Sequence, residues 1–490
     1  MNRTAPLALA LLVVLSGCAG LSVSPPIDRG SASADRVGAV EAPADLADPP
    51  TDTLGWEGGY WYDEPLSITP GDGLNQTERD AVVSRTMARV EYLRGLEFTA
   101  DVPVTVTSRE EFRQRASNRS IPAARRQFDN VKFEALFLIN ESTDSVAVQN
   151  TNTGSSVAGY YTPANDQIVI VGDGAAGFLL KEQTLAHELT HALQDQHFDL
   201  TRYDRETREG HNALSGLIEG DASYVGHLYR DRCGDAWDCL QAPAGGAGGS
   251  GGGLANIGPY LLTYQPYSDG PTFVRQLYRR GGWSAVNDAY DAPPESTEQV
   301  IHPARYPADG PARPTVTDRT RGSWARIPLE NRPDYDAFGE AGTNVMLVFP
   351  GYDSGGATQI VPLRHFLNTE NGQLSRFDPL NYDHYYTEGI RGDRLVPYRD
   401  ADNRTGYVWK LVFDDRTEAT EFRRGYERLL AYHNATAVDS SSGTTVYRIP
   451  EGDRNGFSDA FRVTQRGDTI VITNAPTVGA LKEVRAQPAG

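Results

Sequence analysis

The chain has 490 residues, of which 39% are hydrophobic, enough for two or three domains with sizeable cores. A mean hydropathy of -0.47 excludes a polytopic membrane protein. Acidic residues outnumber basic ones by 65 to 46, and the formal net charge of -19 argues against a nucleic-acid partner because phosphates would be repelled. Acidic residues are dispersed along the chain and lysine is scarce, which favours a halophilic source because high salt screens the charge repulsion. The alternative is an ordinary acidic exported protein.

Residues 1–18 are predicted to be a lipoprotein signal peptide. Arg3 precedes an apolar run, Ala5 to Leu15, that is too short to span a bilayer. The run ends in Leu15-Ser16-Gly17-Cys18, which resembles the lipobox of prokaryotic lipoproteins. That resemblance implies lipidation of Cys18 and a place on the extracellular face of the cell membrane; the alternative is a plain secreted protein.

A disordered tether is predicted for residues 19–55, which are rich in Ala, Asp, Pro and Ser. Order is expected from residue 56, in a first domain that extends to residue 308. Apolar spacing predicts a helix from Thr77 to Leu96. Alternation predicts a strand over Val102 to Val106 and paired strands over Val157 to Val171.

The next predicted helix, about Phe178 to Gln196, contains His187-Glu188-Leu-Thr-His191. Residues four apart share a helical face, so both imidazoles can converge on one cation. Glu188 lies about 100° round the helix, where it can act on a water bound to that cation. This HExxH pattern is typical of zinc hydrolases, with two ligands and a general base on one turn. The other interpretation is a surface helix that carries two histidines by chance.

A second helix is predicted from about His211 to Tyr229, and it supplies Glu219 as a candidate third ligand. At this point the chain resembles the gluzincin metallopeptidases, which pair HExxH on one helix with a glutamate on the next. The resemblance implies a Zn²⁺ site of His187, His191 and Glu219, with Asp221 fixing an imidazole. The alternative for Glu219 is a solvent-facing carboxylate.

His197 is the rival third ligand, because its spacing from His187 and His191 equals that of the metzincins. In that family a glycine turns the chain, whereas here Gln194 stands at the position. The family's Met-turn is not evident either. We therefore favour Glu219, with His197 placed at a helix C-terminus.

An oxyanion donor is also required, and His302 is the candidate, ahead of Tyr160 and Tyr161. A structural histidine beside a proline turn is the alternative for His302. Cys233 and Cys239 are expected to form a disulfide loop, since a metal pair would lack further soft ligands. Five N-x-S/T sequons fit a glycosylated surface protein: Asn75, Asn118, Asn140, Asn403 and Asn434.

The rest of the chain is expected to form a helix over Phe273 to Tyr290, interrupted at Gly281-Gly282, then a linker over residues 309–334. Residues 335–490 are predicted to form a small α+β module with no chemical motif. The fold class is therefore α+β: a zincin-like domain, with a small sheet, an active-site helix and a glutamate-bearing helix, followed by that module.

Four segments between about residues 155 and 305 resemble a family of haloarchaeal surface lipoproteins with a gluzincin-like domain. They contain HELTHALQDQH, EGDA, GWSAVNDAY and PPESTEQVIHP, and GDR and YVW add a weaker match near residues 392–409. The resemblance implies a membrane-anchored extracellular zinc metallopeptidase acting on peptides or proteins. The alternative is a catalytically inactive surface protein with a binding or structural role; metal storage is disfavoured because there is no histidine-rich tract.

Overall fold

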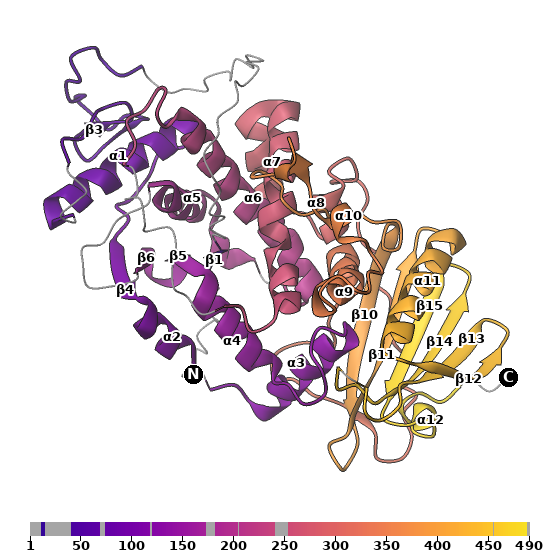
Figure 1. Ribbon diagram of the computed structural model, residues 1–490. Helices are drawn as coiled ribbons and strands as arrows, with labels where there is room; N and C mark the ends of the chain where they lie inside the picture. Colours follow the sequence, from indigo (N-terminus) through magenta and orange to yellow (C-terminus); the bar gives the residue numbers. More distant parts are fainter. Residues whose placement is uncertain are drawn as a thin grey trace.

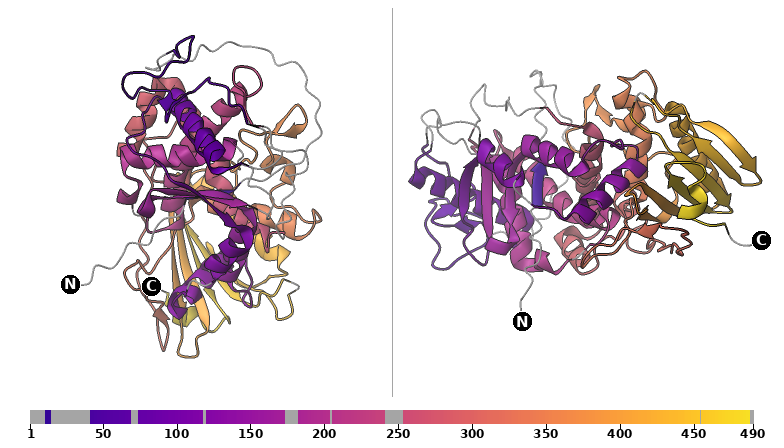
Figure 2. Two further views of the ribbon diagram at one scale, coloured as in Figure 1. Left: turned by 90° about the vertical axis from the view of Figure 1, so that its left-hand side faces the viewer. Right: turned by 90° about the horizontal axis from the view of Figure 1, so that it is seen from below.

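The computed structural model describes residues 11–14, 41–68, 74–117, 120–172, 182–203, 205–240, 253–453 and 455–487. The fold is α+β, as predicted. Helices surround a small sheet in the N-terminal half, and a larger sheet forms the opposite end (Figure 1). The view from below shows these halves end to end (Figure 2, right). Within the described residues, no helix is long and apolar enough to cross a membrane.

The N-terminal sheet has four strands in the order β1-β5-β6-β4. Its members are β1 (Leu11–Val14), β4 (Val104–Ser108), β5 (Val157–Thr162) and β6 (Gln167–Gly172). The predicted paired strands are confirmed: β5 and β6 pair antiparallel around a single turn of 3₁₀ helix, Pro163–Asn165. β4 joins β6 in parallel, and β1 pairs antiparallel with β5.

Eight helices of the described residues belong to this half. They are α1 (Gln76–Arg94), α2 (Arg109–Ser117), α3 (Ala123–Ala135), α4 (Ser145–Ser156), α5 (Glu182–Phe198), α6 (Arg208–Arg232), α7 (Ile257–Asp291) and α8 (Thr297–Ile301). A short 3₁₀ turn, Leu200–Arg202, follows α5. A small antiparallel hairpin, whose strands β2 (Trp56–Glu57) and β3 (Tyr60–Trp61) have two residues each, packs on α1. The helices predicted near the HExxH motif and Glu219 are therefore present as α5 and α6, although the predicted start of the first lies outside the described residues.

Helix α7 is longer than the sequence predicted. It begins at Ile257 rather than Phe273 and contains Pro266 and Pro271. The predicted interruption is confirmed, because Gly281 and Gly282 have non-helical backbone angles. The prolines argued against helix in the sequence, since each removes a backbone donor, but tertiary packing keeps the segment helical.

The C-terminal sheet has seven antiparallel strands in the order β12-β13-β14-β15-β11-β10-β7. They are β7 (Ala325–Arg326), β10 (Ile390–Arg399), β11 (Thr405–Phe413), β12 (Thr436–Ser441), β13 (Thr444–Arg448), β14 (Ala460–Arg466) and β15 (Thr469–Ala475). The accompanying elements are α9 (Gly339–Asp353), α10 (Leu363–Phe366), β8 (Thr369–Glu370), β9 (Gln373–Leu374), α11 (Arg416–Tyr432) and α12 (Leu481–Val484).

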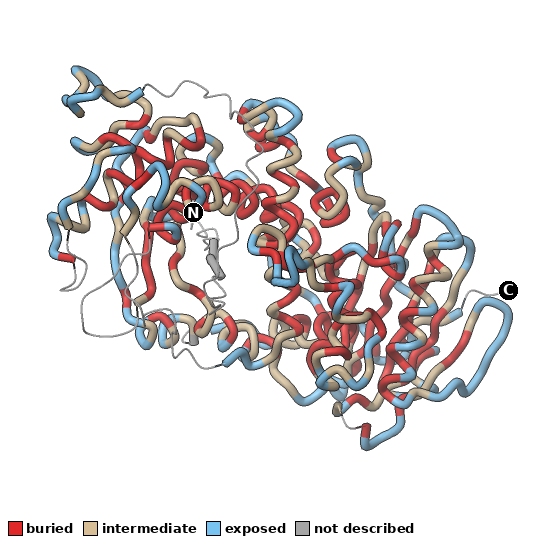
Figure 3. The backbone as a smooth tube through the Cα atoms, turned by 45° about the horizontal axis from the view of Figure 1, so that its top comes forward, coloured by how far each residue is buried: buried red, intermediate tan, exposed pale blue. Residues whose placement is uncertain are grey.

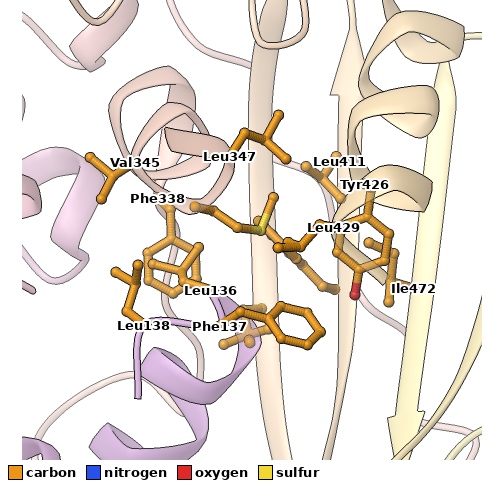
Figure 4. Packing of buried hydrophobic residues seen from close by; sticks show 14 of the residues in the cluster. Leu136, Phe137, Leu138, Phe338, Val345, Leu347, Leu411, Tyr426, Leu429 and Ile472 are labelled. Carbon is orange, nitrogen blue, oxygen red and sulfur yellow. The ribbon is translucent and has the colours of Figure 1, made fainter. Parts of the chain in front are cut away.

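One hydrophobic core joins the two halves. Leu136, Phe137 and Leu138, which follow α3, pack with residues of α9, α11 and the large sheet (Figure 4). Leu261 and Leu262 of α7 belong to the same cluster. Buried residues run along the inner helices of both halves, while exposed ones gather on outer loops (Figure 3). The C-terminal sheet is therefore packed directly against the first half, with which it shares a hydrophobic core.

Candidate metal centre

Helix α5 presents His187 and His191 one turn apart toward α6. Both imidazoles are buried, with 7% and 0% exposure. The helix is held from its other sides by a core stripe that includes Leu185, Leu189 and Leu193, each fully buried. Because the apolar residues fix the rotation of α5, the two histidines must face α6, where Glu219 lies.

His187, His191 and Glu219 form a tight triangle of ligand atoms. The two Nε2 atoms lie 3.0 Å apart, and Glu219 Oε2 lies 3.2 Å from each. Tetrahedral zinc with bonds of about 2.0 Å separates its ligands by about 3.3 Å. The predicted group of three is thus brought together within the geometry that a small dication requires, and Glu219 rather than His197 completes it.

The hydrogen bonds of Gln194 define the tautomer of His191. Gln194 Nε2 donates to the Ile218 carbonyl at 3.0 Å, so its Oε1 must accept from His191 Nδ1 at 2.9 Å. In the neutral imidazole, Nε2 is therefore a bare lone pair aimed at a carboxylate oxygen. Such a contact is repulsive unless a positive charge lies between the atoms, so the donor set fits a bound cation.

The pKa values of His191 and Glu219 also indicate that positive charge is favoured at this site. Burial lowers the pKa of His191, but the charge of Glu219 outweighs burial and raises it to about 9. Burial likewise raises the pKa of Glu219, whereas His191 and His187 together lower it to about 2. Burial and the neighbouring charge of His191 lower the pKa of His187, although Glu219 acts in the opposite direction.

Glu188 is a buried carboxyl group beside this triangle. It is fully buried, and no side chain of the described residues hydrogen-bonds to either oxygen; the backbone N–H of Tyr161 is the polar group that reaches it. Burial raises its pKa to about 8. Gly159 of β5 lies against it: a Cβ at that position would stand 3.1 Å from Glu188 Oε1. A buried carboxyl group without a side-chain partner is costly, and this cost indicates that Glu188 is retained for a ligand or a reaction.

Tyr267 of α7 also reaches the triangle, and the sequence analysis missed it. Its pKa is raised well above the ordinary value by burial and by its hydrogen bond to Glu219. The approach of α7 depends on glycines: a Cβ on Gly220 would lie 2.4 Å from the carbonyl oxygen of Gly270. Two helices that meet backbone to backbone bring the tyrosine hydroxyl beside the third ligand.

Asp221 has a role other than the one predicted. Its carboxylate binds Arg94 at 2.9 Å and accepts from the Tyr290 hydroxyl at 2.8 Å, so it does not orient an imidazole. The physical reason is helix rotation, since residues two apart on α6 point about 200° apart. Gln194 contacts His191 instead. As residue i+3 on the same helix, Gln194 could have been found from the sequence.

The remaining candidates are not brought to the triangle. His197, on the exposed end of α5, donates from Nε2 to the Glu97 carbonyl. His302 lies at the end of α8, with Nε2 3.1 Å from both oxygens of Glu340. Tyr161 donates to Asp195, and Tyr160 packs on the opposite face of β5.

The cysteine prediction is confirmed, whereas the lipidation site lies outside the described residues. Cys233 and Cys239 form a disulfide just after α6. Cys18 falls in the part of the chain that the structure does not describe.

Comparison with known proteins reaches only the C-terminal half. A family described as a domain of unknown function, DUF8575, matches residues 325–485. No curated protein and no solved structure matches the chain. The match covers the seven-stranded sheet and α9 but none of the three candidate ligands. The case for a function of the N-terminal half therefore depends on its own geometry.

Proposed function

We propose that the protein is a zinc-dependent metallopeptidase of gluzincin type, with a zincin-like N-terminal half. The observation that carries the proposal is the triangle of His187, His191 and Glu219 with a buried Glu188, which has no side-chain partner, on the same helix turn. Two imidazoles and one carboxylate are the ligand set of several catalytic zinc sites, which leave a fourth position for water. Zinc bound there would lower the pKa of that water and polarise the scissile carbonyl.

The chain's own groups supply the remaining steps. Glu188 takes a proton from the attacking water and delivers it to the leaving amine. Tyr267 takes the role first assigned to His302: its hydroxyl, at the third ligand, donates to the oxyanion that forms from the carbonyl. Gln194 holds His191 with Nε2 free. Gly159 leaves room for the carboxylate of Glu188 to move.

The location proposed for this activity is the outer face of the cell membrane, through a lipid on Cys18. The apolar run followed by Leu-Ser-Gly-Cys supports it. Mass spectrometry of the detergent-extracted native protein tests it, since a lipidated Cys18 would be the N-terminal residue. Cleavage before Cys18 would also remove β1, and the mature sheet would then consist of β5, β6 and β4.

The central experiment measures zinc content and cleavage of an unstructured protein in high salt. Glu188→Gln should retain zinc and lose cleavage by about 100-fold or more, because a general base contributes that much. Asp195→Asn is the matched control on the same helix: it keeps an acceptor for Tyr161 and should cleave normally. A zinc-free wild type, or cleavage that survives in Glu188→Gln, would refute the proposal. Zinc binding without cleavage would favour a binding or structural role.

A further inference from the structure

A second group of possible metal ligands lies where α8 and α9 meet the segment before β10. It consists of His302, at the end of α8, Glu340, in the first turn of α9, and Asp383. One ligand atom from each lies within 4.8 Å of the others. His302 Nε2 is 3.1 Å from both oxygens of Glu340. Three segments distant in sequence therefore converge on one point.

Glu340 and Asn344 make this more than a surface cluster. Glu340 is fully buried, and among the described residues its carboxylate has His302 as its hydrogen-bonding side chain. Asn344 is also fully buried, yet neither its amide oxygen nor its nitrogen has a partner among the described residues. Residues four apart on a helix share a face, so the unpartnered amide of Asn344 stands on the side of α9 that carries Glu340. Buried polar atoms without partners are rare in folded proteins, so the amide of Asn344 indicates that an ion or another ligand binds beside it.

The charge around the group is negative. Asp383 adds a second carboxylate, and burial together with the carboxylates of Asp378, Glu340 and Asp383 raises the pKa of Asp269, a buried group of α7. Arg305 is the neighbouring cation, but its guanidinium is bound to Glu298 and Asp414. A protonated His302 would balance one carboxylate and leave the other. A dication would balance both.

We propose that His302, Glu340 and Asp383 bind a second divalent cation, separate from the one proposed at His187, His191 and Glu219. One imidazole and two carboxylates suit Zn²⁺ or Mn²⁺, whereas Ca²⁺ takes oxygen ligands. The ion ties α8 and α9 to the segment before β10, and so braces the junction of the two halves. Its role is structural, and it does not depend on peptidase activity.

The test counts metal ions in the full chain. Equilibrium dialysis against Zn²⁺ or Mn²⁺, followed by elemental analysis, should give two ions per wild-type chain. It should give one for His187→Ala/His191→Ala. In that double variant, Asp383→Asn should leave no ion bound at the metal concentration that fills the remaining site without it. Glu388→Gln, another exposed carboxylate of the same segment, is the matched control and should leave the site unchanged.

A second set of measurements distinguishes loss of the metal site from misfolding of the variants. Asp383 is exposed, so Asp383→Asn alone should keep the wild-type circular dichroism while binding one ion fewer. Added Zn²⁺ should raise the Tm of His187→Ala/His191→Ala and not that of the same chain with Asp383→Asn. A folded double variant that binds no ion, or an Asp383→Asn chain that binds as many ions as wild type, would overturn the proposal.

Discussion

Replacing Gln194 by methionine removes the contact that orients His191. The side chain has similar length but neither accepts from Nδ1 nor donates to the Ile218 carbonyl, bonds of 2.9 and 3.0 Å in a fully buried place. Loss of such an outer partner typically weakens metal binding 10- to 100-fold. We therefore expect the Kd for zinc to rise by about that factor, equivalent to about 1.4–2.7 kcal/mol. The unsatisfied carbonyl should cost the metal-free chain a further ~1–3 kcal/mol in unfolding free energy.

The assay is a competition titration of the metal-free chain with zinc and a chromophoric chelator, with urea unfolding in parallel. Gln196→Met is the matched control. Gln196 lies on the same helix and makes three hydrogen bonds: its oxygen accepts from the backbone N–H and the hydroxyl of Thr99, and its nitrogen donates to the Ala100 carbonyl. It does not contact the triangle. Its replacement should leave the zinc Kd unchanged. An unchanged Kd in Gln194→Met would show that His191 needs no outer partner, and would refute the tautomer argument.

Three further changes test other parts of the structure. Gly159→Ala places a methyl group 3.1 Å from Glu188 Oε1, so peptide cleavage should fall while zinc content stays constant; equal cleavage would contradict this. Gly220→Ala drives a Cβ to 2.4 Å from a backbone oxygen of α7 and should cost about 1–3 kcal/mol in urea unfolding, against little for Gly226→Ala, where nothing lies within 4 Å. Burial raises the pKa of Glu209 to about 8. The protonated carboxyl group therefore contributes fully to the unfolding free energy below about pH 4.5, and this contribution is lost as the pH rises through 8. Glu209→Gln should flatten that part of the profile of unfolding free energy against pH.

Local pattern was enough to predict the helices and strands that carry the first site. The apolar stripe of α5 and the spacing of α6 placed His187, His191 and Glu219 correctly because helical periodicity determines which residues share a face. Helix α4 escaped prediction for the opposite reason. Its sequence, SVAVQNTNTGSS, contains poor helix formers, and its stability comes from the cap at Asp144 and from packing on α2 and α3.

The missed residues are those whose position depends on contacts between distant segments. Tyr267 belongs to no motif, and only the close packing of α6 on α7 brings it to Glu219. Asp221 was assigned by analogy, although its rotation on α6 turns it toward Arg94. His302 was recognised as a residue with chemistry, but the sequence could not show that α9 supplies Glu340 as its neighbour.

Helix α7 forms the common wall of both candidate metal sites. Tyr267 faces Glu219, whereas burial and the carboxylates of Asp378, Glu340 and Asp383 raise the pKa of Asp269, two residues later and about 200° round the helix. Gly270, next along the chain, is the point at which α7 touches the backbone of α6. A shift of α7 that opened one site would therefore move a wall of the other. The tight glycine contact keeps α7 in one place, which explains why a helix with two internal prolines is nevertheless packed so closely.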